Sequence, residues 1–285
     1  MSGSCNPASS KIPPTEFHAV MSKIRAFFLK RGYIEGHYQN CLDILLACED
    51  PWNISTFEIG GKKYPQIQSA QLAMEYDLLS NPDIKGIFCV STSYRDEKNR
   101  KEGRHDYAFP LVEFEARGTM EDLVRTEMDL LEHLGYDRFR FQGGKYDSVA
   151  QQYGVKELDH AEEAKMCESH PVFFLTDFPE FTDPFWNMGR YVDCNGELKA
   201  RKVDVILSGM ETFGSAEREC DPKVMRERFE SIVNGDFKRT LFEKFGEDRV
   251  MEEVNRYLSL DFVPRFGAGI GLTRLIKSMK KEELL

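Results

Sequence analysis

Apolar side chains recur along the chain with helical spacing in some stretches and with strand-like density in others. Near the amino end they lie three or four residues apart, which predicts an amphipathic helix that ends before Gly32. The positions that define it are Phe17, Val20, Met21, Ile24, Phe27 and Phe28. A second long helix is predicted over 119–134. Thr119 and Asp122 have the spacing of a capping box, and Gly135 follows as a stop.

Shorter stretches rich in β-branched and aromatic residues predict strands. They are 87–93, 111–116, 172–175 and 203–207. The first two are interpreted as an antiparallel pair joined by a charged loop over 98–106. Thr56–Ile59 and Lys62–Pro65 flank two glycines and predict a β-hairpin. Residues 136–170 give only weak signals.

Local signals predict the remaining elements. Helices are expected at 68–79, 236–245 and 248–259. Another helix is expected to begin at Asp221-Pro222, because proline suits the first helical position. Residues 41–48 fit either a helix or a strand, and 209–218 is expected to lead away from the strand before it.

Antiparallel strands with helices inserted between them predict an α+β fold, with one antiparallel sheet flanked by helices in a single domain. Residues 1–15 are small, polar and proline-containing, and are interpreted as a disordered lead-in. Residues 16–285 are assigned to the domain, because no linker or internal repeat divides them.

Composition narrows the class of protein. Hydrophobic residues make up 41% of the 285 positions, enough for a globular core. The net charge of −10 supplies no broad electrostatic footprint for nucleic acid. The seven cysteines are scattered and never in Cys-x-x-Cys spacing, which favours reduced thiols in the cytoplasm over a zinc site or disulfides. The sequence also shows no membrane span and no signal peptide.

Charged residues cluster on the predicted strand pair. Arg95 and Glu97 would point the same way because side chains alternate along a strand, and Glu113 and Glu115 would share a face of the returning strand. Buried charges must pair with one another or with a ligand. This face is therefore a candidate binding site, with cross-strand ion pairs on a solvent-exposed face as the alternative.

Two carboxylates further along suggest a metal site. Asp204 and Glu211 are seven residues apart. If they converge beside phosphate groups they would bind Mg²⁺, which prefers few protein ligands plus substrate oxygens. Surface acids near a turn are the alternative.

The most glycine-rich stretch, 266–279, closes the chain. Gly267, Gly269 and Gly271 predict a tight backbone that enters the last helix, with Arg274 about one turn inside it. The free N–H groups of a helix amino end, together with an arginine, suit a phosphate group. A glycine-rich connector before an ordinary helix is the alternative.

Taken together, these residues resemble the catalytic core of class II aminoacyl-tRNA synthetases, in the subgroup of aspartyl, asparaginyl and lysyl enzymes. The blocks in their family order are Ser93-Tyr94-Arg95-Asp96-Glu97, Gly103-Arg104-His105, Val112-Glu113-Phe114-Glu115, Asp204 to Glu211, and Gly267 to Arg274. The first resembles motif 2 and the last motif 3. The stretch 171–179 is also typical of the subgroup, whereas motif 1 is faint in 16–45. The resemblance covers roughly residues 16–280.

The resemblance implies an ATP site. Arg95 would hold the α-phosphate and stabilise charge in the transition state of adenylation. Glu97 would accept a hydrogen bond from the adenine amino group. Arg104 or His105, on the charged loop, would reach the γ-phosphate.

It also implies how adenine and the metal are held. Phe109 and Arg274 would stack on opposite faces of adenine, and Asp204 and Glu211 would hold Mg²⁺. The reaction would be attack of a substrate carboxylate on the α-phosphate, giving an acyl-adenylate and pyrophosphate. Arg95 and Arg274 are the implied catalytic residues, acting by position and charge.

The implied amino-acid pocket contains Gln71, Glu75, Glu113 and Arg218. Glu113 would bind the substrate α-ammonium group, and Arg218 a side-chain oxygen. Aspartyl members carry a lysine where Met74 stands, and asparaginyl members have an apolar residue followed by glutamate, as in Met74-Glu75. The local chemistry therefore leans toward asparagine or another neutral side chain.

The sequence departs from the full-length enzymes because only about fifteen residues precede the first helix, with no sign of the OB-fold that reads the anticodon. The first hypothesis is therefore a tRNA-independent enzyme similar to archaeal asparagine synthetases, which would convert aspartate, ATP and ammonia to asparagine, AMP and pyrophosphate. A minimal asparaginyl-tRNA synthetase is the alternative, with tRNA as its partner. A non-catalytic ATP-binding relative is the third hypothesis.

A homodimer is expected, with the helix over 16–32 at its interface.

Overall fold

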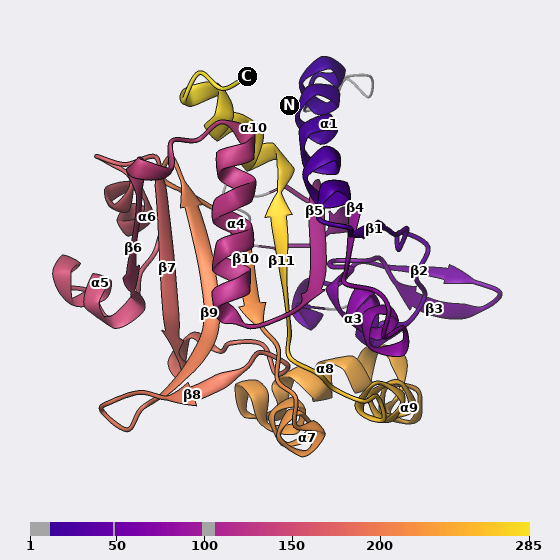
Figure 1. Ribbon diagram of the computed structural model, residues 1–285. Helices are drawn as coiled ribbons and strands as arrows, with labels where there is room; N and C mark the ends of the chain where they lie inside the picture. Colours follow the sequence, from indigo (N-terminus) through magenta and orange to yellow (C-terminus); the bar gives the residue numbers. More distant parts are fainter. Residues whose placement is uncertain (1–11, 48, 99–105) are drawn as a thin grey trace, which may run out of the picture.

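The computed structural model describes residues 12–47, 49–98 and 106–285, and in them nine strands form one central sheet (Figure 1). The main strand order is β1 (Ile34–Glu35), β4 (Gly86–Tyr94), β5 (Ala108–Arg117), β11 (Arg265–Gly271), β10 (Met210–Glu217), β9 (Leu198–Leu207), β7 (Val172–Pro179) and β6 (Phe141–Lys145). β8 (Arg190–Val192) pairs with β9. β1–β4 and β6–β7 are parallel and the other pairs antiparallel, so the predicted α+β fold is confirmed.

Three helices pack on one face of this sheet: α1 (Pro14–Lys30), α4 (Met120–Leu134) and α10 (Leu272–Lys281). A second group packs on the other side near β4: α2 (Ile44–Ala47), α3 (Gln71–Ser80), α7 (Pro222–Ser231), α8 (Asp236–Phe245) and α9 (Glu247–Leu258). α5 (Tyr146–Tyr153) and α6 (His160–Met166) lie beside β7 at the opposite end. Short 3-10 turns are η1 (Pro51–Asn53), η2 (Arg138–Arg140), η3 (Glu180–Thr182) and η4 (Ile232–Gly235).

Several local predictions are confirmed. β2 (Thr56–Ile59) and β3 (Lys62–Pro65) form the predicted hairpin, which projects from the side of the molecule in Figure 1. Thr119 and Asp122 make the capping box of α4, and Gly135 ends that helix at φ 113°, a conformation that favours glycine. α7 begins at Pro222, as its sequence predicts.

The sheet has one apolar and one charged face because side chains alternate along each strand. On β5, Val112 and Phe114 join the core beneath α1 and α4, whereas Glu113 and Glu115 point to the opposite face. β9 repeats this pattern: Val203 and Val205 enter the same core, and Asp204 faces the other way. The charged face is the one on which a site can form.

Two sequence predictions about elements are wrong, and one region contains elements that the sequence does not predict. The glycine-rich stretch is a central strand, β11, and not a tight turn. The segment after Gly209 returns as β10 beside β9. The region 136–170, for which the sequence predicts no element, contains β6, α5 and α6. In each case pairing with neighbouring strands or packing against them stabilises an element whose own sequence gives a weak signal.

Some element lengths also differ from the predictions. β7 and β9 contain 8 and 10 residues, longer than their apolar centres. In the ambiguous region 41–48 the described part forms only the short helix α2. α1 begins at Pro14, two positions before the expected domain start. No helix within the described ranges is long and apolar enough to cross a membrane.

Candidate active site

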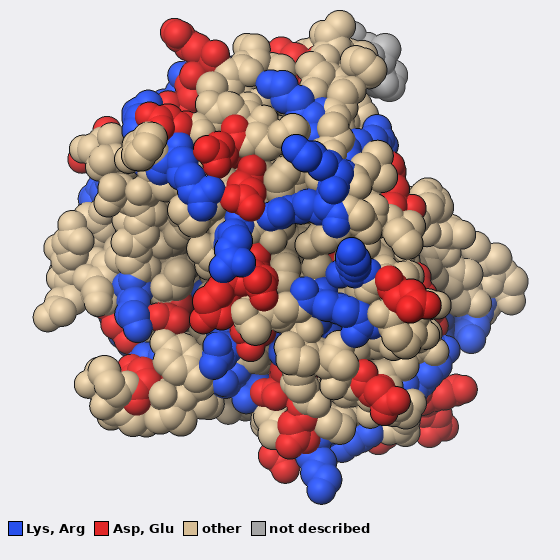
Figure 2. Space-filling view, viewed as in Figure 1, with Lys and Arg blue, Asp and Glu red and all other residues tan. Residues whose placement is uncertain are grey.

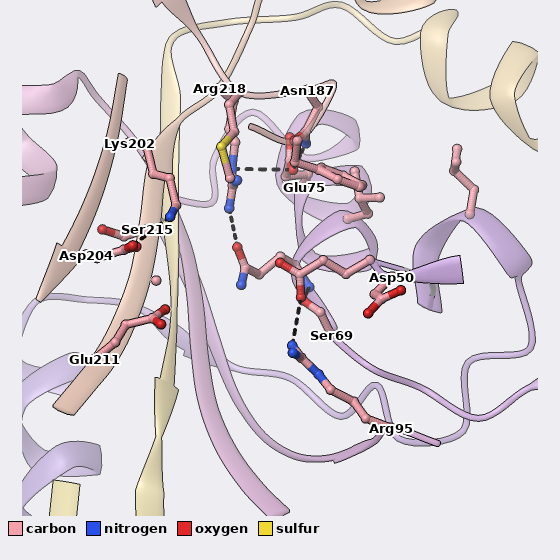
Figure 3. A pocket seen from close by; sticks show the side chains of 17 residues that line it. Asp50, Ser69, Glu75, Arg95, Asn187, Lys202, Asp204, Glu211, Ser215 and Arg218 are labelled. Atoms are coloured by element: carbon pink, nitrogen blue, oxygen red, sulfur yellow. Dashed lines mark hydrogen bonds and ion pairs between the residues drawn. The ribbon is translucent and has the colours of Figure 1, made fainter. Parts of the chain in front are cut away.

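A cavity of about 230 Å³ opens on the charged face of the sheet (Figure 3). Six of the predicted site residues line it: Gln71, Glu75, Arg95, Asp204, Glu211 and Arg218. They come from α3, from the residue after β4, and from β9, β10 and the residue after β10. The fold therefore brings distant parts of the sequence to one place, as the motif order predicts.

A second cavity of about 370 Å³ adjoins the first, and Gln71, Arg95 and Glu211 line both. The other predicted site residues that line the second cavity are Glu97, Phe109, Glu113 and Arg274. All predicted site residues that the structure describes thus lie around one connected space. Arg104 and His105 fall outside the described residues.

β11 forms the floor of this space, and its glycines keep that floor bare of side chains. A Cβ atom on Gly267 would lie 1.8 Å from Oε1 of Glu115, and one on Gly269 would lie 3.0 Å from Nε2 of Gln71. The alternating residues Ala268 and Ile270 point into the core instead. The glycine pattern therefore makes room for site side chains above the strand.

A buried ionic network closes the deep end of the first cavity. Glu75 and Glu115 are 0% exposed, and Arg218 is 5% exposed between them. Arg218 donates to Glu115 and to the side-chain oxygen of Gln71, and its Nε lies 3.5 Å from Oε1 of Glu75. Arg265 donates from Nε to Oε2 of Glu75 at 2.7 Å. Two buried carboxylates therefore meet two buried guanidinium groups.

Glu75 has two further neutral partners. Asn187 donates to its Oε1 at 2.7 Å and Tyr257 donates to its Oε2 at 2.8 Å. Met74, the preceding residue, is fully buried in the apolar core under α3 and does not line the cavity. The position at which aspartyl enzymes carry a lysine is thus part of the core in this protein.

Glu113, which the resemblance implies as the partner of the substrate α-ammonium group, is held by three donors in this structure. Its carboxylate accepts from Ser69 at 2.7 Å, from Ser91 at 2.6 Å, and from the backbone N–H of Ala70. Burial raises the pKa of Glu113, and these three donors oppose that rise. In this structure Glu113 fixes the amino end of α3, which carries Gln71 and Glu75.

Asp204 and Glu211 converge over Gly214. A Cβ atom on Gly214 would lie 3.6 Å from Oε1 of Glu211 and 3.9 Å from Oδ1 of Asp204. Burial raises the pKa of Asp204 to about 7, with Lys202 opposing the rise and Glu211 adding to it. Oδ1 of Asp204 is buried without a hydrogen-bond partner in the part of the chain that the structure describes.

These features fit a divalent cation. The two converging carboxylates and the orphaned Oδ1 supply hard oxygen donors. Clusters of three or more histidine, cysteine, aspartate or glutamate residues that could enclose a metal do not occur among the described residues. A cation at this place would therefore need further oxygens from a nucleotide.

Arg95 lies one residue beyond β4, where it forms a single bridge with Ile54. Nη2 of Arg95 is 3.4 Å from Oε2 of Glu49, and its guanidinium carbon is 5.7 Å from the centre of the Phe109 ring. Arg274 donates to the backbone oxygen of Glu211 at 2.5 Å. Phe109 and Arg274 both line the second cavity, as expected for residues around one flat ligand.

Sequence reasoning missed several residues of the site: Lys202, Arg265, Asn187 and Tyr257. Lys202 donates to Oδ2 of Asp204 at 2.6 Å and lines the first cavity. Strand alternation could have revealed it, since it stands two residues before Asp204. Arg265 and Tyr257 act through Glu75, and no local signal in the sequence joins them to it.

Known proteins share this architecture. The family model for "tRNA synthetases class II (D, K and N)" matches residues 15–284. Asparaginyl-tRNA synthetase from Pyrococcus horikoshii, complexed with asparaginyl-adenylate, has a TM-score of 0.74 at 22% identity, over 94% of this chain and 64% of that one. The asparaginyl-tRNA synthetase of Entamoeba histolytica, also with asparaginyl-adenylate, has a TM-score of 0.72 at 15% identity, over 94% and 64%.

An aspartyl enzyme is similar as well. Aspartyl-tRNA synthetase from Entamoeba histolytica has a TM-score of 0.67 at 18% identity, over 93% of this chain and 54% of that one. No curated protein sequence matches the chain. The chain thus spans less than two thirds of these structures, and the likeness to them shows the fold. Because the family model covers nearly every residue, the chain belongs to the class II tRNA synthetases of the aspartyl, lysyl and asparaginyl group.

Proposed function

We propose that this protein is an ATP-dependent ligase that activates aspartate as an adenylate without using tRNA. In the leading form, aspartate, ATP and ammonia give asparagine, AMP and pyrophosphate. The observation that carries the proposal is the convergence of Arg95, Asp204, Glu211, Arg218 and Arg274 around one connected space. Those residues supply groups for a nucleotide, a divalent cation and an amino acid.

The first step joins aspartate to AMP. A carboxylate oxygen of aspartate attacks the α-phosphorus of ATP, and the bond from that phosphorus to the bridging oxygen of pyrophosphate breaks. Arg95 stabilises the charge on the α-phosphate, while Phe109 and Arg274 hold adenine. Arg95 must leave Glu49 to reach the phosphate, so Glu49 is its partner in the free enzyme.

The second step transfers the acyl group. The nitrogen of ammonia attacks the activated carbonyl carbon, AMP leaves, and the nitrogen loses a proton to solvent. Because the amide of asparagine is on the β-carbon, the β-carboxylate must be the group that was activated. The α-ammonium and α-carboxylate groups then occupy the deep end of the cavity.

The deep end of the cavity suits such a head group because it presents both signs of charge. Arg218 can bind the α-carboxylate, and the carboxylates of Glu75 and Glu115 beside it favour an ammonium group. Gln71 adds an amide between them. In this proposal Arg218 holds the α-carboxylate, in place of the side-chain oxygen that the resemblance implies.

Asp204 and Glu211 would hold Mg²⁺. When bound, this ion would neutralise part of the charge on the phosphate groups. The carboxylates must be ionised for this, and the raised pKa of Asp204 makes its metal affinity sensitive to pH near neutrality.

The distribution of charge on the surface gives little support for nucleic-acid binding. Figure 2 shows acidic and basic side chains interspersed over one face, with no extended basic surface there.

A minimal asparaginyl-tRNA ligase is the second candidate. Met74-Glu75 favours it, because Glu75 can accept a hydrogen bond from a substrate amide, and Asn187 already donates one to it. In that case the α-carboxylate of asparagine attacks ATP and the side chain occupies the deep end. The two candidates therefore place the amino acid in opposite orientations.

Hydroxylamine trapping tests the proposal. The protein is incubated with ATP, Mg²⁺, hydroxylamine and either aspartate or asparagine, and the hydroxamate is identified by mass spectrometry and NMR. We expect aspartate β-hydroxamate, and asparagine in its place when ammonia replaces hydroxylamine. An asparagine α-hydroxamate, with charging of total tRNA by labelled asparagine, would establish the second candidate and overturn the first.

A further inference from the structure

Lys202 is a cation inside the first cavity to which the proposed reaction assigns no role. It lies on the charged face of β9, two residues before Asp204, and Figure 3 shows its ammonium group directed to that carboxylate. Nζ is 2.6 Å from Oδ2 of Asp204 and 3.9 Å from the centre of the Phe178 ring. Its ammonium group thus lies over an aromatic ring as well as beside a carboxylate.

Lys202 also lies close to the deep end of the cavity. Its cross-strand partner on β10 is Ala216, and Arg218 follows two residues later with its side chain in the same cavity. Diagonal neighbours on paired strands are about 7–8 Å apart, within reach of long side chains, and Arg218 lies one residue past the end of β10. A small carboxylate between them could contact both Lys202 and Arg218.

The two cations differ in how firmly they are held. Arg218 is 5% exposed and is paired with both Glu75 and Glu115. Lys202 is ion-paired with Asp204 alone among the described residues, through a flexible stem. Asp204 is also the carboxylate that a divalent cation would bind, so a metal ion and Lys202 compete for it.

We propose that Lys202 binds the α-carboxylate of the amino-acid substrate. In the free enzyme it neutralises Asp204. When the metal–nucleotide complex takes Asp204, the ammonium group turns to the substrate carboxylate that is not activated, beside Arg218. Lys202 thereby supplies, from β9, a cation that the fully buried Met74 cannot supply from α3. This inference rests on the proposed function for the identity of the substrate.

Direct binding measurements test whether Lys202 contacts the substrate. Calorimetry records the affinity for L-aspartate and for β-alanine, which is aspartate without its α-carboxylate, in the presence of Mg²⁺ and a non-hydrolysable ATP analogue. We expect Lys202→Gln to weaken aspartate binding about tenfold or more and to change β-alanine binding less than about twofold. Lys202→Met, which keeps a long unbranched side chain without the charge, should do the same, and Lys202→Arg should restore aspartate binding. Lys145→Gln removes a surface cation paired with Asp177 and should match the wild type.

Metal binding tests whether Lys202 and a metal ion compete for Asp204. Mn²⁺ affinity, measured by electron paramagnetic resonance with the same ATP analogue and no amino acid, should rise several-fold in both Lys202→Gln and Lys202→Met. Equal losses for the two amino acids, or unchanged aspartate binding, would overturn the inference, as would weaker Mn²⁺ binding in these variants.

These outcomes separate the inference from the proposed function. If the wild type binds aspartate in a Lys202-dependent way but forms no hydroxamate, the proposed reaction is wrong and the binding role of Lys202 stands. If the wild type forms hydroxamate while the Lys202 variants bind aspartate normally, the reaction stands and the inference fails. A wild type that binds no aspartate overturns the inference.

Discussion

Glu127 on α4 is an unusual residue because it is an acidic side chain with 0% exposure on the apolar side of the sheet. Burial raises the pKa of Glu127 to about 8, and Ser215 opposes only part of the rise. The folded protein therefore keeps this proton in a pH range where the unfolded chain has released it.

This difference predicts how stability depends on pH. The contribution of Glu127 is fully present below the unfolded pKa, near 4.3, and is lost as the pH rises toward 8, by at most about 1.4 kcal/mol per pH unit. Glu127→Gln should remove that contribution. The free energy of unfolding of the variant, relative to that of the wild type, should therefore rise by about 3 kcal/mol from pH 5 to pH 8. Denaturant unfolding of both proteins at each pH measures this. A stability difference that is the same at every pH would contradict the assignment.

Individual site residues were predictable to different degrees. Arg95, Asp204, Glu211 and Arg274 stand in a recognisable order, and the structure places all of them around one space. Arg265 could not be found in this way, because its contact with Glu75 spans 190 positions of sequence. A sequence motif reveals the side chains that line the site. It does not reveal the distant side chains that hold them in position.

At the scale of elements, β11 was misread because glycine is ordinarily a weak strand former. Its stability comes from its neighbours, since it pairs with β5 on one side and β10 on the other. Strands with strong apolar or alternating patterns, such as β4 and β5, were predicted correctly and only their ends differ. Strand order in the sheet depends on long-range pairing, which no local pattern contains.

The bare floor formed by β11 leads to a prediction about Gly267. A methyl group there would overlap Glu115 and push it from Arg218, breaking a buried ion pair. Gly267→Ala should therefore lower the free energy of unfolding by about 3–5 kcal/mol and abolish aspartate binding. Gly271→Ala is the matched control in the same strand, because a Cβ there meets its nearest neighbour at 3.6 Å. Urea unfolding compares the two, and equal stabilities would contradict the close-packing argument.

At the scale of the whole molecule, we predict a homodimer formed through α1 and β1. β1 is an edge strand, and Leu29 and Ile34 are 56% and 52% exposed beside it. Exposed apolar side chains along a strand edge are suited to pairing with a second chain. Light scattering should give twice the 32.9 kDa chain mass.

A pair of variants tests this interface. Leu29→Glu with Ile34→Glu should yield monomers, whereas Phe139→Glu, at a 97% exposed position on η2, should leave the dimer intact. A wild-type protein that is monomeric at tens of micromolar would rule the interface out.

The central claim is that this connected cavity forms an amino-acid adenylate, and exchange of labelled pyrophosphate into ATP measures that step directly. The assay is run with each common amino acid alone, in the presence of Mg²⁺. We predict exchange that depends on aspartate and disappears in Arg95→Gln, because the role proposed for Arg95 is to stabilise charge on the α-phosphate. Absence of exchange with every amino acid would contradict it.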